Sequence, residues 1–175
     1  MNILIYTQCF APKFGGIESV MTNIATQASL QNHNVKVLAD GSSYLNSKFD
    51  NVQKFEIYRF NQFRFFRKKI KFSFANNLIK ENEFDIIFFD SWKSLEGFET
   101  KKKIKKICLV HGNEILQSKK EDRIKSSLKN ADGIIFNSLF TQKLFFKIFK
   151  KITTKKFKII YPAFIKSLEA TKSKK

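Results

Sequence analysis

The sequence predicts an α/β fold: a Rossmann-like, doubly wound parallel sheet in a single domain. Short runs rich in Ile, Val and Phe alternate with longer amphipathic stretches along most of the 175 residues. The runs are almost continuously apolar, which is typical of parallel strands buried on both faces. A hydrophobic share of 43% with 27% charged residues indicates a globular chain that can bury a core.

Strands and helices are predicted in regular alternation. The predicted strands are residues 2–8, 35–39, 55–60, 84–90, 106–111, 133–137 and 157–162. The predicted helices are residues 17–28, 69–82, 117–130 and 139–150. The first helix has one apolar stripe at helical spacing, formed by Ile17, Val20, Met21, Ile24, Ala25 and Ala28. Such alternation favours crossover connections between parallel strands.

One stretch, residues 60–74 ("FNQFRFFRKKIKFSF"), interleaves aromatic and basic residues. We interpret it as a strand that runs into a helix whose phenylalanines face the core. The alternative is a surface that contacts a membrane or a nucleic acid through the same residues.

The charge is strongly positive, with a formal net charge of +18. Only four of the basic residues are arginines, and the rest are lysines accompanied by much Phe, Ile and Asn. This bias is typical of an AT-rich genome, whereas selection for bidentate phosphate or base recognition would favour arginine. We therefore expect the charge to be only partly functional. No helix-turn-helix, RNP or zinc pattern accompanies it, so nucleic acid is not an expected partner.

Cys9 and Cys108 lie far apart in apolar, strand-like segments. They show no metal-ligand spacing, so we expect two reduced, buried thiols and no metal site. The opening "MNILIY" shows no basic leader followed by a long apolar region, and no apolar run reaches membrane-spanning length. The predicted location is the cytoplasm.

A glycine pair, Gly15-Gly16, lies between the first predicted strand and the first predicted helix. Glycine lets backbone N–H groups approach a ligand closely, and a helix N-terminus favours anions. The spacing matches neither a GxGxxG fingerprint nor a P-loop. Taken alone, the pair is either an anion-binding loop or a plain tight turn.

Polar residues also follow the later strands, where ligands bind in doubly wound sheets. The fourth strand is followed by Asp90 and Trp92, the fifth by His111 and Glu114, and the sixth by Asn137 and Ser138. For several of these residues, the alternative to ligand binding is a simpler structural role. Ser138 can cap the next helix, and Asp90 with Trp92 can form a helix cap with one packed aromatic ring.

Six motifs together resemble the N-terminal domain of family 4 glycosyltransferases of the GT-B fold. The first is "APKFGGIESV", in which Pro12, Gly15, Gly16 and Glu18 match a P-x-x-G-G-x-E loop. The others follow in the family's order: "NHNVKVLA", "FDIIFFDSW", "CLVHGNEI", "ADGIIFNSLFTQKLF" and "KIIYPAF". Asn32 stands where the family usually has glycine.

The resemblance implies a donor site on the glycine loop. Gly15 and Gly16 would face the phosphates of a nucleotide-sugar donor. Glu18 would orient that loop or a ligand hydroxyl, although a carboxylate in a first helical turn is also stabilised by the helix dipole. Asn137 and Ser138 would line the donor side of the cleft.

The resemblance also implies that His111 is the catalytic residue, which contacts the donor sugar near its reacting carbon. An electrostatic role in an oxocarbenium-like transition state fits that position, and general base catalysis is the alternative. Asp90, Trp92 and Glu114 would lie on the acceptor side.

The implied protein is a retaining hexosyltransferase of cell-surface polysaccharide or glycolipid synthesis. Residues 1–165 would form the acceptor-side domain, and residues 166–175 a basic tail or the start of an interdomain linker. We expect no cofactor and no metal, with a nucleotide-sugar donor as substrate and a sugar or lipid-linked acceptor. The expected partners are a C-terminal donor domain, in cis or in trans, and an anionic membrane surface. Without that domain the chain would be inactive. The alternative is a non-catalytic partner of a split glycosyltransferase that recruits it to the membrane or binds the acceptor.

Overall fold

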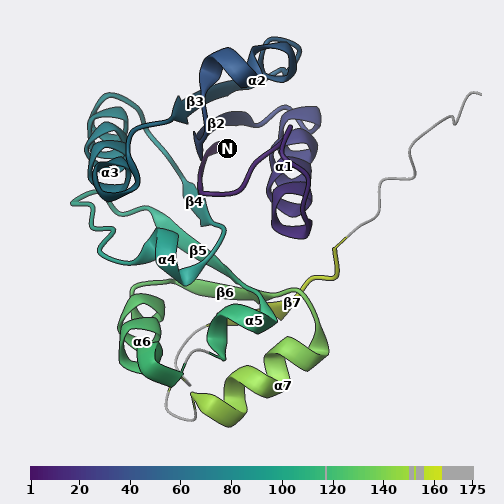
Figure 1. The fold of residues 1–175 in the computed structure, drawn as a ribbon, viewed down its shortest axis with the longest axis vertical. Helices are drawn as coiled ribbons and strands as arrows, with labels where there is room; N and C mark the ends of the chain where they lie inside the picture. Colours follow the sequence, from purple (N-terminus) through teal and green to yellow (C-terminus); the bar gives the residue numbers. More distant parts are fainter. Residues whose placement is uncertain (117, 150–151, 153–155, 163–175) are drawn as a thin grey trace, which may run out of the picture.

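The structure is a computed structural model that describes residues 1–116, 118–149, 152 and 156–162 (Figure 1). Seven parallel strands form one sheet in the order β3-β2-β1-β4-β5-β6-β7. They are β1 (Asn2–Thr7), β2 (Asn34–Asp40), β3 (Glu56–Phe60), β4 (Ile86–Phe89), β5 (Lys105–Val110), β6 (Gly133–Phe136) and β7 (Lys156–Ile159). The prediction of a doubly wound parallel sheet is therefore confirmed.

The strands are connected mainly by helices. These are α1 (Gly16–Leu30), α2 (Ser43–Asp50), α3 (Arg64–Glu81), α4 (Trp92–Leu95), α5 (Gly112–Ile115), the 3₁₀ turn η1 (Ser118–Lys120), α6 (Glu121–Lys129) and α7 (Leu139–Ile148). None of the helices in the described residues is long and apolar enough to cross a membrane.

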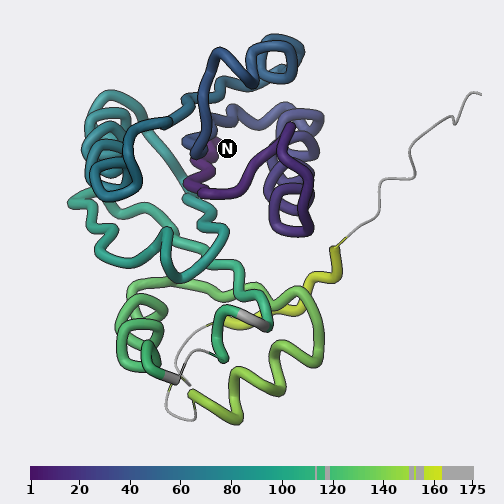
Figure 2. Tube along the Cα trace, in the orientation of Figure 1, coloured from purple at the N-terminus to yellow at the C-terminus, as the bar shows by residue number. Residues whose placement is uncertain are grey.

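The strand order reverses direction between β1 and β4. The chain first builds the sheet outward from β1 through β2 to β3, then returns to add β4 on the other side of β1. Ile3 of β1 consequently lies between Val35 of β2 and Ile86 of β4. Figure 2 shows this inner strand with α1 and α3 on either side. In such sheets the carboxyl edge at the reversal is where ligands bind.

Two hydrophobic clusters cover the two faces of the sheet. On one face, α1 and α2 pack through residues such as Met21 and Phe49 against Ile5 and Val37. On the other face, α3, α4, α6 and α7 pack on strand residues that alternate with the first set. This arrangement explains why the strand sequences are continuously apolar.

The interpretation of residues 60–74 is only partly right. Phe60 is buried in β3, and Phe72 and Phe74 pack against the core. However, α3 begins at Arg64 rather than at residue 69. Its first turn carries Phe65 and Phe66, whose side chains are 81% and 63% exposed. The preceding residue, Phe63, is 69% exposed. These three rings face away from the core because the core-facing stripe of α3 starts only at Lys71 and Ala75.

Other differences concern short or polar elements. The helices α2, α4 and α5 are not predicted by the sequence, since two have only four residues and α2 has no buried residue. The predicted helix 117–130 consists of η1 and α6, with residue 117 outside the described residues. Residue 150 of the last predicted helix, and the boundary and tail predicted over residues 163–175, also lie outside them. Cys108 is buried in β5, as predicted, but Cys9 lies after β1 and is only half-buried.

Candidate functional site

The Asp90 carboxylate links the two strands at which the sheet order reverses. It is 1% exposed and follows β4 directly. Its Oδ2 accepts hydrogen bonds from Thr7 Oγ1 at 2.9 Å and from the backbone N–H of Gln8 at 2.7 Å and Cys9 at 3.2 Å. Its Oδ1 accepts from the hydroxyl of Ser94. A buried carboxylate with this many donors fixes the start of the glycine loop.

His111 is held by the main chain of the same residue. Its Nε2 lies 3.0 Å from the Asp90 carbonyl oxygen. A carbonyl oxygen can only accept, so Nε2 carries the proton and Nδ1 keeps its lone pair. Burial lowers the pKa of His111, an effect that the Asp90 carbonyl and carboxylate oppose. The ring is therefore a neutral imidazole at the carboxyl edge of β5, where its side chain accepts from the Glu114 backbone N–H in a capping box.

Glu114 fixes the turn that carries His111. Its Oε1 accepts a hydrogen bond from the His111 backbone N–H at 3.0 Å. Burial raises the pKa of Glu114 to about 8, so the side chain is mostly protonated at neutral pH. It thus acts on the backbone of the His111 turn, and its predicted place on the acceptor side stays a prediction.

The glycine pair has an extended rather than a left-handed backbone. Gly15 has φ 166° and ψ 163°, and Gly16 does not have a left-handed backbone either. Glu18 approaches Gly15 closely, although its carboxylate is the far end of a flexible side chain that can move aside. The Oε2 atom of Glu18 lies 2.1 Å from the point that a Cβ on Gly15 would occupy, whereas Gly16 has open space around it. The chain's own carboxylate therefore sits at the N-terminus of α1, the place predicted for donor phosphates, and a phosphate there would have to displace or join it.

The Cys9 thiol beside this loop is neutral. Burial, reinforced by the Asp90 and Glu18 carboxylates, raises the pKa of Cys9 to about 12. Since the thiolate is the nucleophile, Cys9 is not activated for covalent chemistry.

Ser138 is the N-cap of α7, which was the alternative role predicted for it from the sequence. Ser138 Oγ accepts from the Thr141 backbone N–H at 3.1 Å. Thr141 Oγ1 donates to Asn137 Oδ1 at 2.7 Å. Both polar groups predicted on the donor side are thus already engaged with the first turn of α7, and their contact with a donor stays a prediction.

Trp92, the first residue of α4, is almost completely buried. The ring is 1% exposed and lies under two cations, with the Arg123 guanidinium at 5.8 Å and the Lys93 ammonium at 5.9 Å from its centre. Its Nε1 has no hydrogen-bond partner among the described residues. The Trp92 ring thus forms the surface against which these two cations pack.

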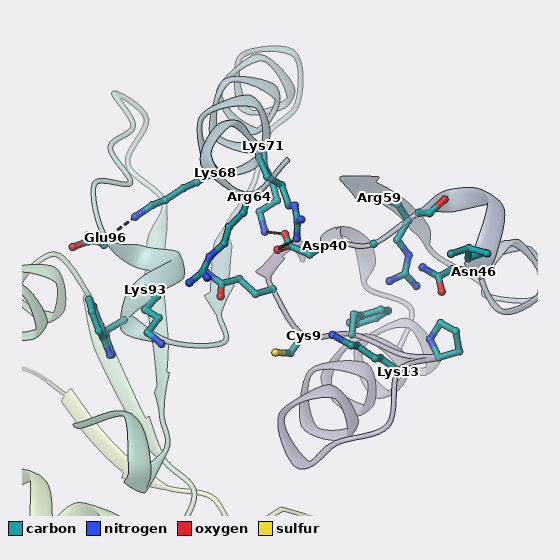
Figure 3. Close-up of a pocket in the computed structure, with 18 of the residues that line it drawn as sticks. Cys9, Lys13, Asp40, Asn46, Arg59, Arg64, Lys68, Lys71, Lys93 and Glu96 are labelled. Atoms are coloured by element: carbon teal, nitrogen blue, oxygen red, sulfur yellow. Dashed lines mark hydrogen bonds and ion pairs between the residues drawn. The ribbon is translucent and has the colours of Figure 1, made fainter. Parts of the chain in front are cut away.

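Two hollows open at this edge of the sheet. The larger, which we call the basic cavity, has a volume of about 940 Å³ and is shown in Figure 3. Its walls come from the loops after β1 and β2, from α3 and from α4, and they carry nine basic but only two acidic side chains. The smaller, the apolar groove, has a volume of about 370 Å³ and lies between α1, the ends of β5 and β6, and residues 160–162.

Three of the nine predicted residues line these hollows, and Gly15, Gly16, Glu18, Asp90, Glu114 and Ser138 line neither. Trp92 lines the basic cavity, and His111 and Asn137 line the apolar groove. The hydrogen bonds of Asp90 connect the two. The basic cavity was not predicted from the sequence. The scarcity of arginine was a hint, because it makes the few arginines of this lysine-rich chain stand out. No group of three or more His, Cys, Asp or Glu residues within the described ranges is placed to hold a metal ion.

Comparison with known proteins identifies a family. The family model for Glycosyltransferase Family 4 matches residues 14–164. No curated protein matches the chain. Among solved structures, Anabaena Alr3699/HepE in complex with UDP-glucose is similar, with a TM-score of 0.63, 14% identity, and coverage of 94% of this chain and 44% of that one.

Two further structures share the fold. The N-terminal domain of Candida albicans trehalose-6-phosphate phosphatase gives a TM-score of 0.58 at 11% identity, covering 91% of this chain and 48% of that one. A ugt transferase from Siraitia grosvenorii in complex with UDP gives 0.53 at 11% identity, covering 98% and 53%. The chain thus spans about half the length of each structure that it resembles.

Proposed function

Since the chain belongs to glycosyltransferase family 4, we propose that it is the acceptor-side domain of a retaining transferase that uses a nucleotide-sugar donor. Two of the similar structures contain UDP-glucose or UDP, which supports a donor of this class. The observation that carries the proposal is the His111 ring, held neutral at the carboxyl edge beside the point where the strand order reverses.

The neutral ring suits a sugar-binding role. With Nε2–H committed to the Asp90 carbonyl, Nδ1 is the ring atom that would accept from a sugar hydroxyl, in exchange for the Glu114 backbone N–H of the capping box. A hydroxyl held in this way stabilises positive charge on the sugar ring as the leaving group departs. Such preorganised groups contribute most when they need no rearrangement in the transition state. The Glu114 contact to the His111 N–H supplies that rigidity.

The nucleotide would be held by a second domain, in cis or in trans. Two observations support this part of the proposal: the chain covers about half of the similar structures, and the Glu18 carboxylate at the glycine loop leaves the loop a poor phosphate site by itself. We expect the 175-residue chain alone to transfer little or no sugar. Measurable transfer from UDP-glucose or another nucleotide-sugar by the purified chain would contradict this.

The test of the catalytic role substitutes the two histidines in turn. With the donor-binding domain supplied, His111→Ala should lower kcat by about 10²-fold, as is usual for the loss of one transition-state contact. The matched control is His33→Ala, because His33 directly precedes β2, lines neither hollow, and has its ring beside the N-terminal amine. Equal kcat values for the two variants would refute the role of His111.

A membrane-associated site of action is supported by the start of α3. Phe63, Phe65 and Phe66 are exposed there beside Arg64 and Lys68, and aromatic rings among cations are typical of helices that bind anionic membranes. We propose that this surface brings the chain to the membrane for cell-surface polysaccharide or glycolipid synthesis. A non-catalytic, membrane-recruiting partner of a split transferase would use the same surface, and the His111 test distinguishes the two.

Vesicle sedimentation tests this surface. The double variant Phe65→Ser/Phe66→Ser should bind anionic vesicles several-fold more weakly than the native chain, because each buried ring adds apolar area to the contact. Phe140→Ser is the control, since Phe140 is equally exposed on α7. Binding by the native chain that ignores both anionic lipid and salt would contradict the proposal.

A further inference from the structure

All four arginines of the chain line the basic cavity. Arg59 comes from β3, Arg64 and Arg67 from α3, and Arg123 from α6. Only five of the 29 lysines do so. In a chain that otherwise uses lysine for its positive charge, arginine is concentrated at one place. The bidentate fork of arginine suits phosphate and carboxylate oxygens better than the single ammonium group of lysine.

Three carboxylates hold much of this wall in position. Asp50 binds Arg59 through Nε at 3.0 Å and Nη2 at 2.7 Å. Asp40 is shared by Lys71 at 2.6 Å and Arg67 at 3.0 Å.

Glu96 is shared in the same way, by Lys68 at 2.9 Å and Arg123 at 2.8 Å. Because both Asp40 and Glu96 face two cations each, the wall keeps a net positive charge after every pair is counted.

Three further cations have no carboxylate partner within the described residues. They are Lys13 on the glycine loop, Arg64 at the start of α3 and Lys93 on α4. Figure 3 shows them entering the hollow from three different sides. Like charges that line one hollow repel one another, and an anion bound between them relieves the repulsion.

We propose that the basic cavity binds the phosphate group of a phosphorylated acceptor, held between Lys13, Arg64 and Lys93. The proposal rests on the proposed glycosyltransferase function and adds the chemical class of its acceptor. Gln8, Ser42 and Asn46 also line the cavity, and they supply neutral donors and acceptors for the hydroxyls of the phosphorylated molecule. The cavity volume of about 940 Å³ is of the size of small-molecule sites.

Donor phosphates are the less suitable occupant of this cavity. The glycine loop contributes to it through Pro12 and Lys13, while Gly15 and Gly16 are not among the lining residues. His111, the residue proposed to contact the donor sugar, lines the apolar groove instead. The hydrogen bond from His111 to Asp90, two residues before Trp92 of the cavity wall, places the two sites next to each other.

Binding is tested by calorimetry at physiological ionic strength, where long-range attraction to the net charge is largely screened. The probes are glucose 6-phosphate, glucose, glucuronate, and vesicles of phosphatidylcholine with or without phosphatidic acid. Arg64→Gln and Lys93→Gln should each weaken binding of a phosphate probe about tenfold, the usual effect of losing one charge-assisted hydrogen bond. Lys143→Gln, which removes the same charge from the exposed face of α7, should change it less than twofold.

Each outcome decides the proposal. Binding of glucose 6-phosphate but not glucose or glucuronate, with this dependence on Arg64 and Lys93, supports a soluble phosphorylated acceptor. The same dependence seen only with phosphatidic acid vesicles supports a phosphate carried by a lipid. Binding of glucuronate as tight as glucose 6-phosphate, equal losses in Lys143→Gln, or no binding of any phosphate probe would overturn it. None of these measurements needs a donor or turnover, so they can fail while sugar transfer and the role of His111 stand.

Discussion

The basic cavity and the apolar groove lie at the same edge of one sheet yet differ in almost every property. The cavity has nine cations and a polar wall from α2, α3 and α4. The groove is lined chiefly by aliphatic and aromatic side chains, among them Ile24 and Leu109, with Asn23, Gln27, His111 and Asn137 as polar members. The cavity is lined by the loops after β1 and β2 and by residues of α3, α4 and α6, and the groove by α1 and the ends of β4 to β6.

This difference shows how a doubly wound sheet separates two binding tasks. A charged ligand needs cations that are partly hydrated, whereas a neutral imidazole needs burial that lowers its pKa. The fold keeps the two environments apart by lining them with different helices, the cavity with α3, α4 and α6 and the groove with α1. Asp90 joins them, because its carboxylate holds the β1 loop and its carbonyl holds His111.

Removing the Asp90 carboxylate should have the largest effect on the stability of the fold. Asp90→Ala removes the buried acceptor of the Thr7 hydroxyl and of the Gln8 and Cys9 backbone N–H groups, and we expect a loss of about 3 kcal/mol or more in the free energy of unfolding. Urea denaturation measures it. Asp85→Ala is the control, since the Asp85 carboxylate accepts one exposed hydrogen bond from Asn2 and should cost about 1 kcal/mol or less. Similar losses in the two variants would show that Asp90 does not join the two regions.

A smaller effect is expected from the cavity wall. Lys71 is 3% exposed and donates to the Thr7 carbonyl at 2.7 Å as well as to Asp40. Burial lowers the pKa of Lys71, and Asp40 opposes the shift. Lys71→Met keeps the volume but removes both hydrogen bonds, so we expect a loss of about 1–3 kcal/mol. Lys69→Met, on the exposed face of α3, provides the comparison. A cost no greater than in that variant would mean that the buried ammonium does not support the wall.

The smallest expected effect is on the pH dependence of stability, in which two glutamates, Glu114 and Glu96, should act in opposite directions. Burial raises the pKa of Glu114 to about 8, while hydrogen bonds, first from Arg123, lower the pKa of Glu96. The Glu114 contribution to stability is therefore intact below its ordinary pKa of 4.5 and is lost as the pH rises to about 8. The Glu96 contribution is present above its ordinary pKa of 4.5 and is lost as the pH falls below it.

Melting curves of the two glutamine variants check these opposite signs. Glu114→Gln should raise Tm at pH 8 by roughly 2–4 °C, the shift for about 1 kcal/mol in a chain of this size, and leave it nearly unchanged at pH 4. Glu96→Gln should lower Tm at pH 8 and less so at pH 4. Parallel pH dependence of the two variants would contradict the assignment of different environments.

The sequence was sufficient for the elements whose pattern is local. Most strands are nearly continuous apolar runs, and α1 has a clear stripe through Met21 and Ala25, so both could be predicted within a few residues. The helix α2 was missed because it buries no residue and so has no stripe to find. The exposed Phe65 and Phe66 were assigned to the core, since composition alone does not say on which side of a helix a ring lies.

The candidate site was predicted in part for the same reason. Asp90, His111 and Ser138 were found because strand ends are visible in the sequence, and the Ser138 cap is a contact between near neighbours. The hydrogen bond from His111 to Asp90 spans 21 residues, and no local pattern announces it. Glu18 was noted, but only the folded loop shows its carboxylate against Gly15.

By itself, then, the sequence determined the α/β alternation, the glycine loop and the scarcity of arginine. Only the tertiary structure decided that Arg59, Arg64, Arg67 and Arg123 line one cavity. The physical reason is that these residues belong to β3, α3 and α6, and which elements become neighbours depends on the strand order and on the side of each crossover. Both are set by the packing of the whole sheet, to which every strand and helix contributes.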